Sequence, residues 1–266
     1  MTSFQGTEHY VSSDELNQAV SCALVLGRPL LVKGEPGTGK TLLASAISEA
    51  LDRPLFRWHV KSTSKAQEGL YNYDVVARLN DSRFGGGDVH DLRSYIRMGP
   101  LGLAFQKDCP AVVLVDEIDK ADPEFPNDLL RELDEMAFTI TELDETVTAI
   151  HRPLVIITSN AEKELPDAFL RRCVFHFIDF PDPDRMRQII DVHHPDLSEK
   201  LVETAAARFF QLRQERGLRK RPSTSELVDW LAVLAHHGVK AEDLAAAMPY
   251  LGTLLKDERD LQRLAI

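Results

Sequence analysis

The 266-residue sequence is poor in cysteine and has no long uninterrupted apolar run. Its three cysteines include no Cys-x-x-Cys pair, so they offer neither a disulfide framework nor a zinc-binding motif and suit a reducing compartment. The longest apolar stretch, residues 19–32, is broken by Gly27-Arg28-Pro29 and is too short to cross a bilayer. The N-terminus is polar and acidic, whereas a secretory signal peptide begins basic and continues apolar. These absences predict a soluble cytoplasmic protein.

The sequence also lacks an excess of positive charge. It has 31 Lys and Arg residues against 42 Asp and Glu residues, a formal net charge of −11 at pH 7. This balance argues against nucleic acid or an anionic membrane as the main partner, because both bind through positive protein charge. The hydrophobic content of 44% is ordinary for a globular protein. The chain can therefore bury a sizeable core in one large or two unequal domains.

Short apolar runs alternate with helix-forming patterns along the first two thirds of the chain. Several runs are continuously apolar, which is typical of parallel strands that are covered on both faces. Strands that alternate with helices indicate an α/β layered domain. The predicted strands cover residues 28–34, 55–60, 111–116, 153–160 and 174–180, with helices at 12–27 and 41–52 and a β-hairpin at 137–150.

The character of the sequence changes after residue 180. Residues 184–266 carry helical patterns and no convincing strand. We therefore place a boundary near Pro181, between an α/β domain over residues 1–180 and a small helical domain over residues 181–266. Within the first domain, Gly85-Gly86-Gly87 is expected to form a mobile loop.

The segment GEPGTGKT, residues 34–41, fits the phosphate-binding pattern G-x-x-x-x-G-K-[ST]. It lies after a predicted strand and opens a predicted helix, a context that a chance glycine-rich turn would lack. The glycines let backbone N–H groups face phosphate oxygens, while Lys40 supplies positive charge and Thr41 a hydroxyl ligand for Mg²⁺. The expected nucleotide contacts are Gly34, Glu35, Pro36, Gly37, Thr38, Gly39, Lys40, Thr41 and Leu42.

Four carboxylates follow the predicted strand at residues 111–116, and they are Asp116, Glu117, Asp119 and Asp122. Adjacent like charges at the end of a core strand cost free energy unless a ligand uses them. Asp116 is predicted to bind Mg²⁺, and Glu117 to polarise a water for attack on the γ-phosphate. Asp119 is expected to make a supporting or subunit-interface contact, and Asp122 to cap the next helix. The adjacent pair favours hydrolysis over nucleotide storage.

Three later residues have side chains that a nucleotide hydrolase uses. Asn160 ends a predicted strand, and its neutral amide can orient the attacking water without adding charge beside Glu117. Arg171 and Arg172 follow a short helical pattern and can act as an arginine finger supplied to a neighbouring subunit, an interaction worth about 10³–10⁵ in rate. The simpler alternatives are a turn asparagine and a solvated cation pair at a helix C-terminus.

These segments together resemble the AAA+ ATPases and, within them, the MoxR family. The resemblance rests on GEPGTGKT, VVLVDEIDKADPEFPNDLLRELDE, the hairpin FTITELDETVTA, VIITSNAEKELPDAFLRRC and FIDFPDPD, which occur in the family's order. It implies a P-loop NTPase fold with a five-stranded parallel sheet flanked by helices, a helical lid domain, and a ring that commonly has six subunits. The bound cofactors that it implies are ATP and Mg²⁺.

The resemblance also assigns roles to individual residues. Lys40 and Thr41 correspond to the Walker A motif, and Asp116 and Glu117 to Walker B. Asn160 corresponds to sensor 1. The finger that acts in trans corresponds to Arg172, with Arg171 as second choice, and the residues expected near the adenine base are Tyr10 and Val11.

One position departs from the MoxR pattern. Many MoxR proteins carry a sensor 2 arginine just after a proline at the start of a lid helix, and here Ser223 stands in that place. The preceding basic residues Arg219, Lys220 and Arg221 remain candidates for that role, with Arg221 the expected nucleotide contact. Arg213 and Arg216 belong to the same basic run.

The leading hypothesis is an ATP-driven oligomeric remodeller of a protein client, since MoxR-like proteins are thought to act as chaperones, often on partners with a von Willebrand factor A domain. The alternative is an ATP-gated switch or scaffold with slow turnover, for example in a defence or signalling system. A DNA motor is disfavoured by the acidic balance, a GTPase by the lack of an NKxD motif, and a metabolite kinase by the Asp116–Glu117 pair.

Overall fold

A computed structural model describes residues 4–264 of the chain. Its contacts divide the chain into two compact units. The first unit contains residues 4–5, 13–33 and 41–177, and the second contains residues 6–12, 34–40 and 178–264. The glycine-rich loop at residues 34–40 is thus grouped with the C-terminal helices.

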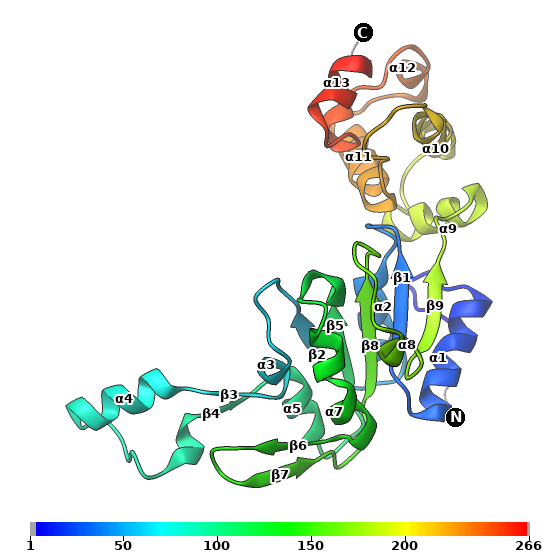
Figure 1. Cartoon of the computed structure of the whole chain (residues 1–266). Helices are drawn as coiled ribbons and strands as arrows, with labels where there is room; N and C mark the ends of the chain where they lie inside the picture. The colour runs from blue at the N-terminus through cyan, green and yellow to red at the C-terminus, as the bar shows by residue number, and fades with distance from the viewer. Residues whose placement is uncertain (1–3, 265–266) are drawn as a thin grey trace. The chain divides into compact units, whose positions relative to one another are not determined.

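A five-stranded parallel sheet forms the centre of the first unit, with the strand order β2-β5-β8-β1-β9 (Figure 1). The strands are β1 (Leu30–Gly34), β2 (Leu55–His59), β5 (Val112–Asp116), β8 (Leu154–Ser159) and β9 (Val174–Ile178). All residues of β5 and β8 are buried, as expected for apolar strands covered on both faces. At the edge of the sheet, β9 exposes Phe175 and Phe177. The predicted α/β fold with a parallel five-stranded sheet is therefore confirmed.

The register of the sheet brings the carboxyl ends of three strands to one level. His59 at the end of β2 pairs with Asp116 at the end of β5, and Val115 pairs with Ile157 in β8. Polar residues that follow these strands consequently meet at the same edge, which is where ligands bind in open α/β sheets.

Helix α1 (Asp14–Leu26) begins and ends at residues that the sequence marks as caps. Ser13 Oγ accepts a hydrogen bond from the Leu16 N–H at 3.2 Å, and Gly27 ends the helix in the left-handed conformation with φ 59°. The other helical elements of this unit are α2 (Lys40–Ala50), α3 (Ala66–Leu70), α4 (Val75–Phe84), η1 (Leu92–Tyr95), α5 (Pro100–Phe105), η2 (Ile118–Lys120), α6 (Phe125–Asp128), α7 (Leu130–Glu135) and α8 (Asp167–Leu170).

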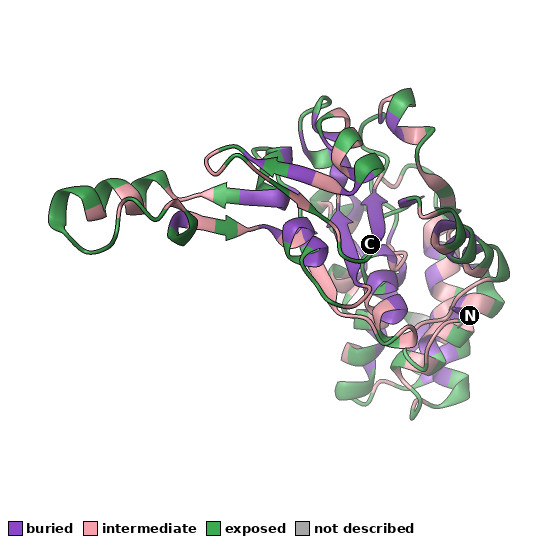
Figure 2. Ribbon diagram, turned by 90° about the horizontal axis from the view of Figure 1, so that it is seen from below, coloured by how far each residue is buried: buried purple, intermediate pink, exposed green. Residues whose placement is uncertain are grey.

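The segment between β2 and β5 contains an antiparallel pair, β3 (Tyr71–Tyr73) and β4 (Ile96–Met98), which carries α4 away from the sheet (Figures 1 and 2). Gly85 ends α4 with φ 73°, so the first of the three consecutive glycines is a helix C-cap. Helix α4 contains no buried residue. The predicted hairpin is present as β6 (Ala137–Ile140) and β7 (Glu145–Thr148).

Aromatic side chains fill the core beside the sheet. The ring centroids of Trp58 and Phe125 are 5.3 Å apart, and those of Phe105 and Phe138 are 5.9 Å apart. Gly69 in α3 lies under the Trp58 indole, where a Cβ atom would be 2.1 Å from Cζ3. Only glycine fits this contact, because real Cβ atoms do not approach a ring so closely.

The prediction that Asp122 caps a helix is wrong. Helix α6 begins at Phe125, and the residue at its N-cap position, Glu124, makes no side-chain cap hydrogen bond. Asp122 Oδ1 instead accepts a hydrogen bond from the Glu124 N–H at 3.1 Å. A short carboxylate side chain readily forms such a local turn two residues on, and this turn competes with helix capping.

The second unit contains only helices among its described C-terminal residues 179–264. Trp230 and Phe209 are fully buried in its core, and the Trp230 Nε1–H donates to the Pro249 carbonyl at 2.7 Å. The helices are α9 (Pro183–His193), α10 (Glu199–Gln214), α11 (Thr224–His236), α12 (Ala241–Ala246), η3 (Leu251–Thr253) and α13 (Glu258–Leu264). Within residues 4–264, no helix has the length and apolar character needed to cross a membrane.

Candidate active site

The glycine-rich loop joins β1 directly to α2. Gly37 and Gly39 have φ values of 75° and 83°, a conformation that residues with a Cβ rarely adopt. Space is also short: a Cβ on Gly34 would lie 2.7 Å from the Ile178 carbonyl, and one on Gly37 would lie 2.6 Å from Ser223 Oγ. The loop conformation therefore depends on glycine at these positions.

Lys40 is buried, and its ammonium group is held by the loop itself. Nζ donates to the carbonyls of Gly34 at 2.9 Å and Glu35 at 2.8 Å. Thr38 Oγ1 also donates to the Glu35 carbonyl at 2.8 Å. These contacts place one positive charge inside the curve of the loop, where phosphate oxygens can accept from it.

Asp116 lies at the carboxyl end of β5 and is buried among hydrogen-bond donors. Its Oδ1 accepts from Thr158 Oγ1 at 2.7 Å and from Thr41 Oγ1 at 3.0 Å. His59 Nδ1 lies 3.1 Å from Oδ2. Thr41 and Asp116, which the sequence predicts to act together, are therefore in direct contact.

The Thr41 hydroxyl and the Asp116 carboxylate form an oxygen-only ligand pair, which suits Mg²⁺. No group of three or more His, Cys, Asp or Glu side chains within residues 4–264 is arranged to hold a metal ion. A Mg²⁺ ion would consequently need further oxygens from phosphate and water. This is the usual manner of Mg²⁺ binding, because the ion gives up its water ligands reluctantly.

Glu117 adopts an uncommon left-handed backbone conformation, with φ 58°. Its N–H donates to Thr158 Oγ1 at 2.8 Å, so this one hydroxyl contacts both acids of the pair. The Glu117 carboxylate contacts the end of β8, where its Oε1 accepts from Asn160 Nδ2 at 3.0 Å. Its Oε2 accepts from Lys120 Nζ, and this contact raises the pKa of Lys120.

Asp119 makes the supporting contact that the sequence predicts. It is buried, with 3% of its surface exposed, and its Oδ2 accepts from the N–H groups of Asn160 at 3.1 Å and Glu162 at 2.9 Å. These hydrogen bonds fix the backbone after β8, and Asn160 carries the amide that contacts Glu117.

Arg171 and Arg172 lie on the surface after α8. The Arg172 Nε–H donates to Asp134 Oδ2 at 2.6 Å and its Nη1–H to the Ala168 carbonyl at 2.9 Å. Among the contacts of residues 4–264, neither arginine forms a hydrogen bond with Glu117. The structure thus brings together Thr41, Asp116, Glu117 and Asn160, and leaves both arginines outside this cluster.

In the second unit, Arg213 contacts the glycine-rich loop. Its Nη2–H donates to Glu35 Oε2 at 2.9 Å, and its guanidinium carbon lies 3.4 Å from the Phe180 ring centroid. A third contact joins Nη1 to the Pro222 carbonyl. The sequence placed Arg213 in the basic run but did not distinguish it, since only the fold of α10 shows which arginine faces the loop.

The other basic residues of that run lie elsewhere. The backbone N–H groups of Arg219 and Lys220 donate to the buried Asp260 carboxylate. Arg221 is exposed and forms no hydrogen bond or ion pair with any other residue of the described chain. Ser223 forms a capping box with Glu226 at the start of α11.

Tyr10 and Val11 lie in the same unit as the loop. Tyr10 Cε2 is 3.4 Å from the position that a Cβ on Gly39 would take, and the Val11 carbonyl accepts from Arg185 Nη2 at 3.4 Å. Burial raises the pKa of the Tyr10 hydroxyl to about 12, against the smaller opposing effect of the Arg185 charge. Tyr10 therefore remains neutral at any physiological pH.

Comparison with known proteins agrees with this geometry. Residues 30–181, more than half of the chain, match the ATPase family associated with various cellular activities, AAA. The chain belongs to this family. The match covers the Walker segments, so this AAA protein carries a nucleotide-binding domain of the ATPase type.

Two curated proteins are similar to this chain at less than 30% identity. A mitochondrial Lon protease homolog of Phaeodactylum tricornutum is 29% identical over 210 residues, which cover 76% of this chain and 20% of that protein. A putative 26S proteasome regulatory subunit homolog of Methanothermobacter thermautotrophicus is 26% identical over 219 residues, which cover 81% of this chain and 50% of that protein. The AAA chain thus spans at most half the length of these relatives.

Proposed function

We propose that this AAA ATPase is a MoxR-like protein that hydrolyses ATP with Mg²⁺ in a hexameric ring and thereby remodels or matures a protein partner. The observation that carries the hydrolysis in this proposal is the contact of Glu117 with Asn160, next to the contact of Asp116 with Thr41. A protein that only stored nucleotide would need the second contact but not the first. The client and the ring rest on the MoxR resemblance.

Each residue of the cluster has a separate role in the proposed reaction. The loop N–H groups and Lys40 bind the phosphates, and Thr41 and Asp116 hold Mg²⁺, which would neutralise charge on the transferred phosphoryl group. Glu117 accepts the proton of the attacking water, and Asn160 orients that water. Thr158 holds both acids in register through its hydroxyl.

The test is the variant Glu117→Gln, which keeps the size of the side chain and one acceptor oxygen but cannot act as a base. We expect phosphate release from ATP to fall by about 10²–10⁴-fold, the usual worth of a general base. Binding of a fluorescent ATP analogue should change little, because the phosphate-binding loop is intact. Glu49→Gln, an exposed residue of α2, is the matched control. Hydrolysis at the wild-type rate in Glu117→Gln would contradict the assignment.

The proposed client is a protein that contains a von Willebrand factor A domain. The MoxR resemblance supports this choice, and the two relatives, named for a protease and a proteasome subunit, support a protein client over a metabolite. Affinity capture with the Glu117→Gln protein and ATP should retain a protein of this domain class, and ADP should release it. Capture that is equal in Lys40→Ala, which cannot hold the phosphates, would count against the proposal.

A second candidate function is an ATP-gated switch with slow turnover, and the Lys120 contact favours it. Asn160 and Lys120 each donate to one oxygen of Glu117, so an attacking water must share the carboxylate with a neighbouring ammonium group. Lys120→Met distinguishes the two functions. A switch that is restrained by this ion pair should hydrolyse ATP several-fold faster in the variant, whereas in a remodelling motor the rate should stay within about twofold.

A further inference from the structure

We propose that a groove in the first unit, apart from the nucleotide cluster, binds a basic segment of a protein partner. The inference rests on the proposed function in one respect, that the client is a protein, and it specifies the chemistry by which the client is recognised. The groove has a volume of about 570 Å³, which lies within the range of about 300–1,000 Å³ that is typical of ligand clefts.

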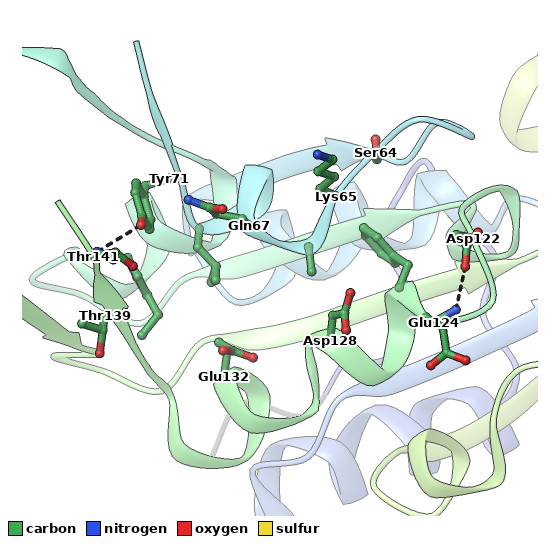
Figure 3. A pocket seen from close by; sticks show the side chains of 14 residues that line it. Ser64, Lys65, Gln67, Tyr71, Asp122, Glu124, Asp128, Glu132, Thr139 and Thr141 are labelled. Atoms are coloured by element: carbon green, nitrogen blue, oxygen red, sulfur yellow. Dashed lines mark hydrogen bonds between the residues drawn. The ribbon is translucent and has the colours of Figure 1, made fainter. Parts of the chain in front are cut away.

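Two walls and a closed end define the groove (Figure 3). Residues 64–71, which include α3, form one wall, and residues 122–132, which include α6, form the other. Strand β6 and Thr141 close the end, where the Thr141 N–H donates to Tyr71 Oη at 3.1 Å. All of these residues belong to the first unit, so its own fold shapes the groove.

The charge of the groove is strongly negative. Its lining contains four carboxylates, those of Asp122, Glu124, Asp128 and Glu132, against the single ammonium of Lys65. Figure 3 shows the carboxylates of Asp128 and Glu132 on the wall across from Lys65. A polyanion such as nucleic acid would be repelled here, and a cationic ligand attracted.

Two of these carboxylates, those of Glu132 and Asp128, are not paired with a cation within residues 4–264. Glu132 Oε2 is shielded from solvent and has no hydrogen-bond partner within residues 4–264. Asp128 is exposed and forms no ion pair in the same part of the chain. The exposed carboxylate of Asp128 can accept from a lysine or arginine of a ligand, and Glu132 adds a second negative charge to the same wall.

The floor of the groove is apolar, and this favours a basic peptide over a small inorganic cation as the ligand. Leu70, Phe125 and Phe138 line it, and each is a buried core residue that shows only a small part of its surface there. A small inorganic cation would gain nothing from this surface. A peptide in which lysine or arginine flanks a large apolar side chain matches both features, because the apolar side chain covers the floor while the cations meet Asp128 and Glu132.

The experiment measures peptide binding to the full chain without nucleotide, so that it does not depend on hydrolysis. The probe is a fluorescein-labelled nine-residue peptide with lysines and arginines around one phenylalanine and one leucine, and binding is followed by fluorescence anisotropy. We expect saturable binding that weakens roughly fivefold in the double variant Asp128→Asn/Glu132→Gln, from the loss of two partly exposed ion pairs. Asp108→Asn, an exposed carboxylate outside the groove, should bind as wild type.

Two altered peptides test the two features separately. Replacing the phenylalanine and leucine by serine should weaken binding through the floor, and replacing the basic residues by glutamate should abolish it. The single variant Asp128→Asn serves if the double variant does not fold, since that side chain has no partner to lose. Circular dichroism confirms the fold of each variant.

Three results would overturn the inference: equal binding by wild type and both variants, displacement of the peptide by spermine at equal charge concentration, or self-association of the chain that the double variant abolishes. The last result would assign the groove to a second copy of the chain. Phosphate release is measured in parallel. Normal ATP hydrolysis without peptide binding rejects only the groove, whereas peptide binding without hydrolysis rejects only the proposed ATPase reaction.

Discussion

At the scale of single residues, Thr158 is the contact on which the acidic cluster depends. Its hydroxyl donates to Asp116 and accepts from the Glu117 N–H, and it is buried at the end of β8. A hydroxyl can donate and accept at once, so it joins one carboxylate to the backbone of the next residue. Valine has nearly the same shape but can do neither.

The variant Thr158→Val should therefore lose stability and activity together. It leaves the partly buried Glu117 N–H and the buried Asp116 carboxylate without the Thr158 hydroxyl, which costs about 1–3 kcal/mol in the free energy of unfolding. Urea denaturation measures this loss of stability. Because Asp116 is then less firmly positioned, ATP hydrolysis should also need a higher Mg²⁺ concentration for half-maximal rate. Thr148→Val, on the exposed face of β7, is the control and should be neutral. Equal stability of both variants would refute the linking role of Thr158.

Residue identity alone predicted much of this cluster. Thr41, Asp116, Glu117 and Asn160 were all named from the sequence, because a glycine-rich motif and polar residues at strand ends are local signals. Thr158 was not, since a threonine inside an apolar strand resembles any other β-branched residue. Its importance follows from the register between β5 and β8.

At the scale of elements, close packing between α3 and β2 requires glycine at one position. Gly69 faces the Trp58 indole, and Trp58 also contacts Phe125 in α6. The sequence shows one glycine in a short helical segment, which by itself predicts only a weaker helix. The tertiary contact makes Gly69 stabilising, because the absence of a side chain leaves room for the Trp58 indole in the core.

Gly69→Ala should destabilise the first unit even though alanine is the better helix former. The added methyl group must displace the indole, and overpacking of this kind costs about 1–3 kcal/mol. Thermal unfolding followed by circular dichroism measures the effect. Gly252→Ala serves as the control, since a Cβ there would meet nothing within 4 Å. A Gly69→Ala protein as stable as wild type would show that the indole moves freely.

At the scale of the whole molecule, binding of a nucleotide should stabilise the folded chain. ATP with Mg²⁺ at about 100 times the dissociation constant should add about 2.7 kcal/mol to the free energy of unfolding. Differential scanning fluorimetry should show this as a rise in Tm for wild type and Glu117→Gln. Lys40→Ala should show no rise, because it lacks the charge that binds phosphate. If ATP with Mg²⁺ raised the Tm of Lys40→Ala, the assignment of Lys40 to phosphate binding would be wrong.

The whole molecule is also expected to assemble into a ring, in which Arg172 of one subunit would complete the active site of its neighbour. Within one chain Arg172 pairs with Asp134 and not with Glu117, so the proposed role of Arg172 as an arginine finger requires a neighbouring subunit. We expect ATPase activity per subunit to rise with protein concentration, and Arg172→Ala to lower the rate by about 10³-fold or more without preventing assembly. Sedimentation velocity with parallel phosphate-release assays tests both. Activity that is independent of concentration would place the whole site in one subunit.

The sequence by itself determined the α/β fold, the parallel sheet, the hairpin and the phosphate-binding motif, because each depends on local pattern and spacing. Only the tertiary structure decided which basic residue faces the loop, where Arg213 contacts Glu35 and Arg219 and Lys220 turn to Asp260. It also placed Asp122 in a turn and formed the acidic groove by bringing residues 64–71 beside residues 122–141, about fifty positions further along the chain. Such pairings depend on strand register and helix packing, which bring distant residues together without any signal near either one.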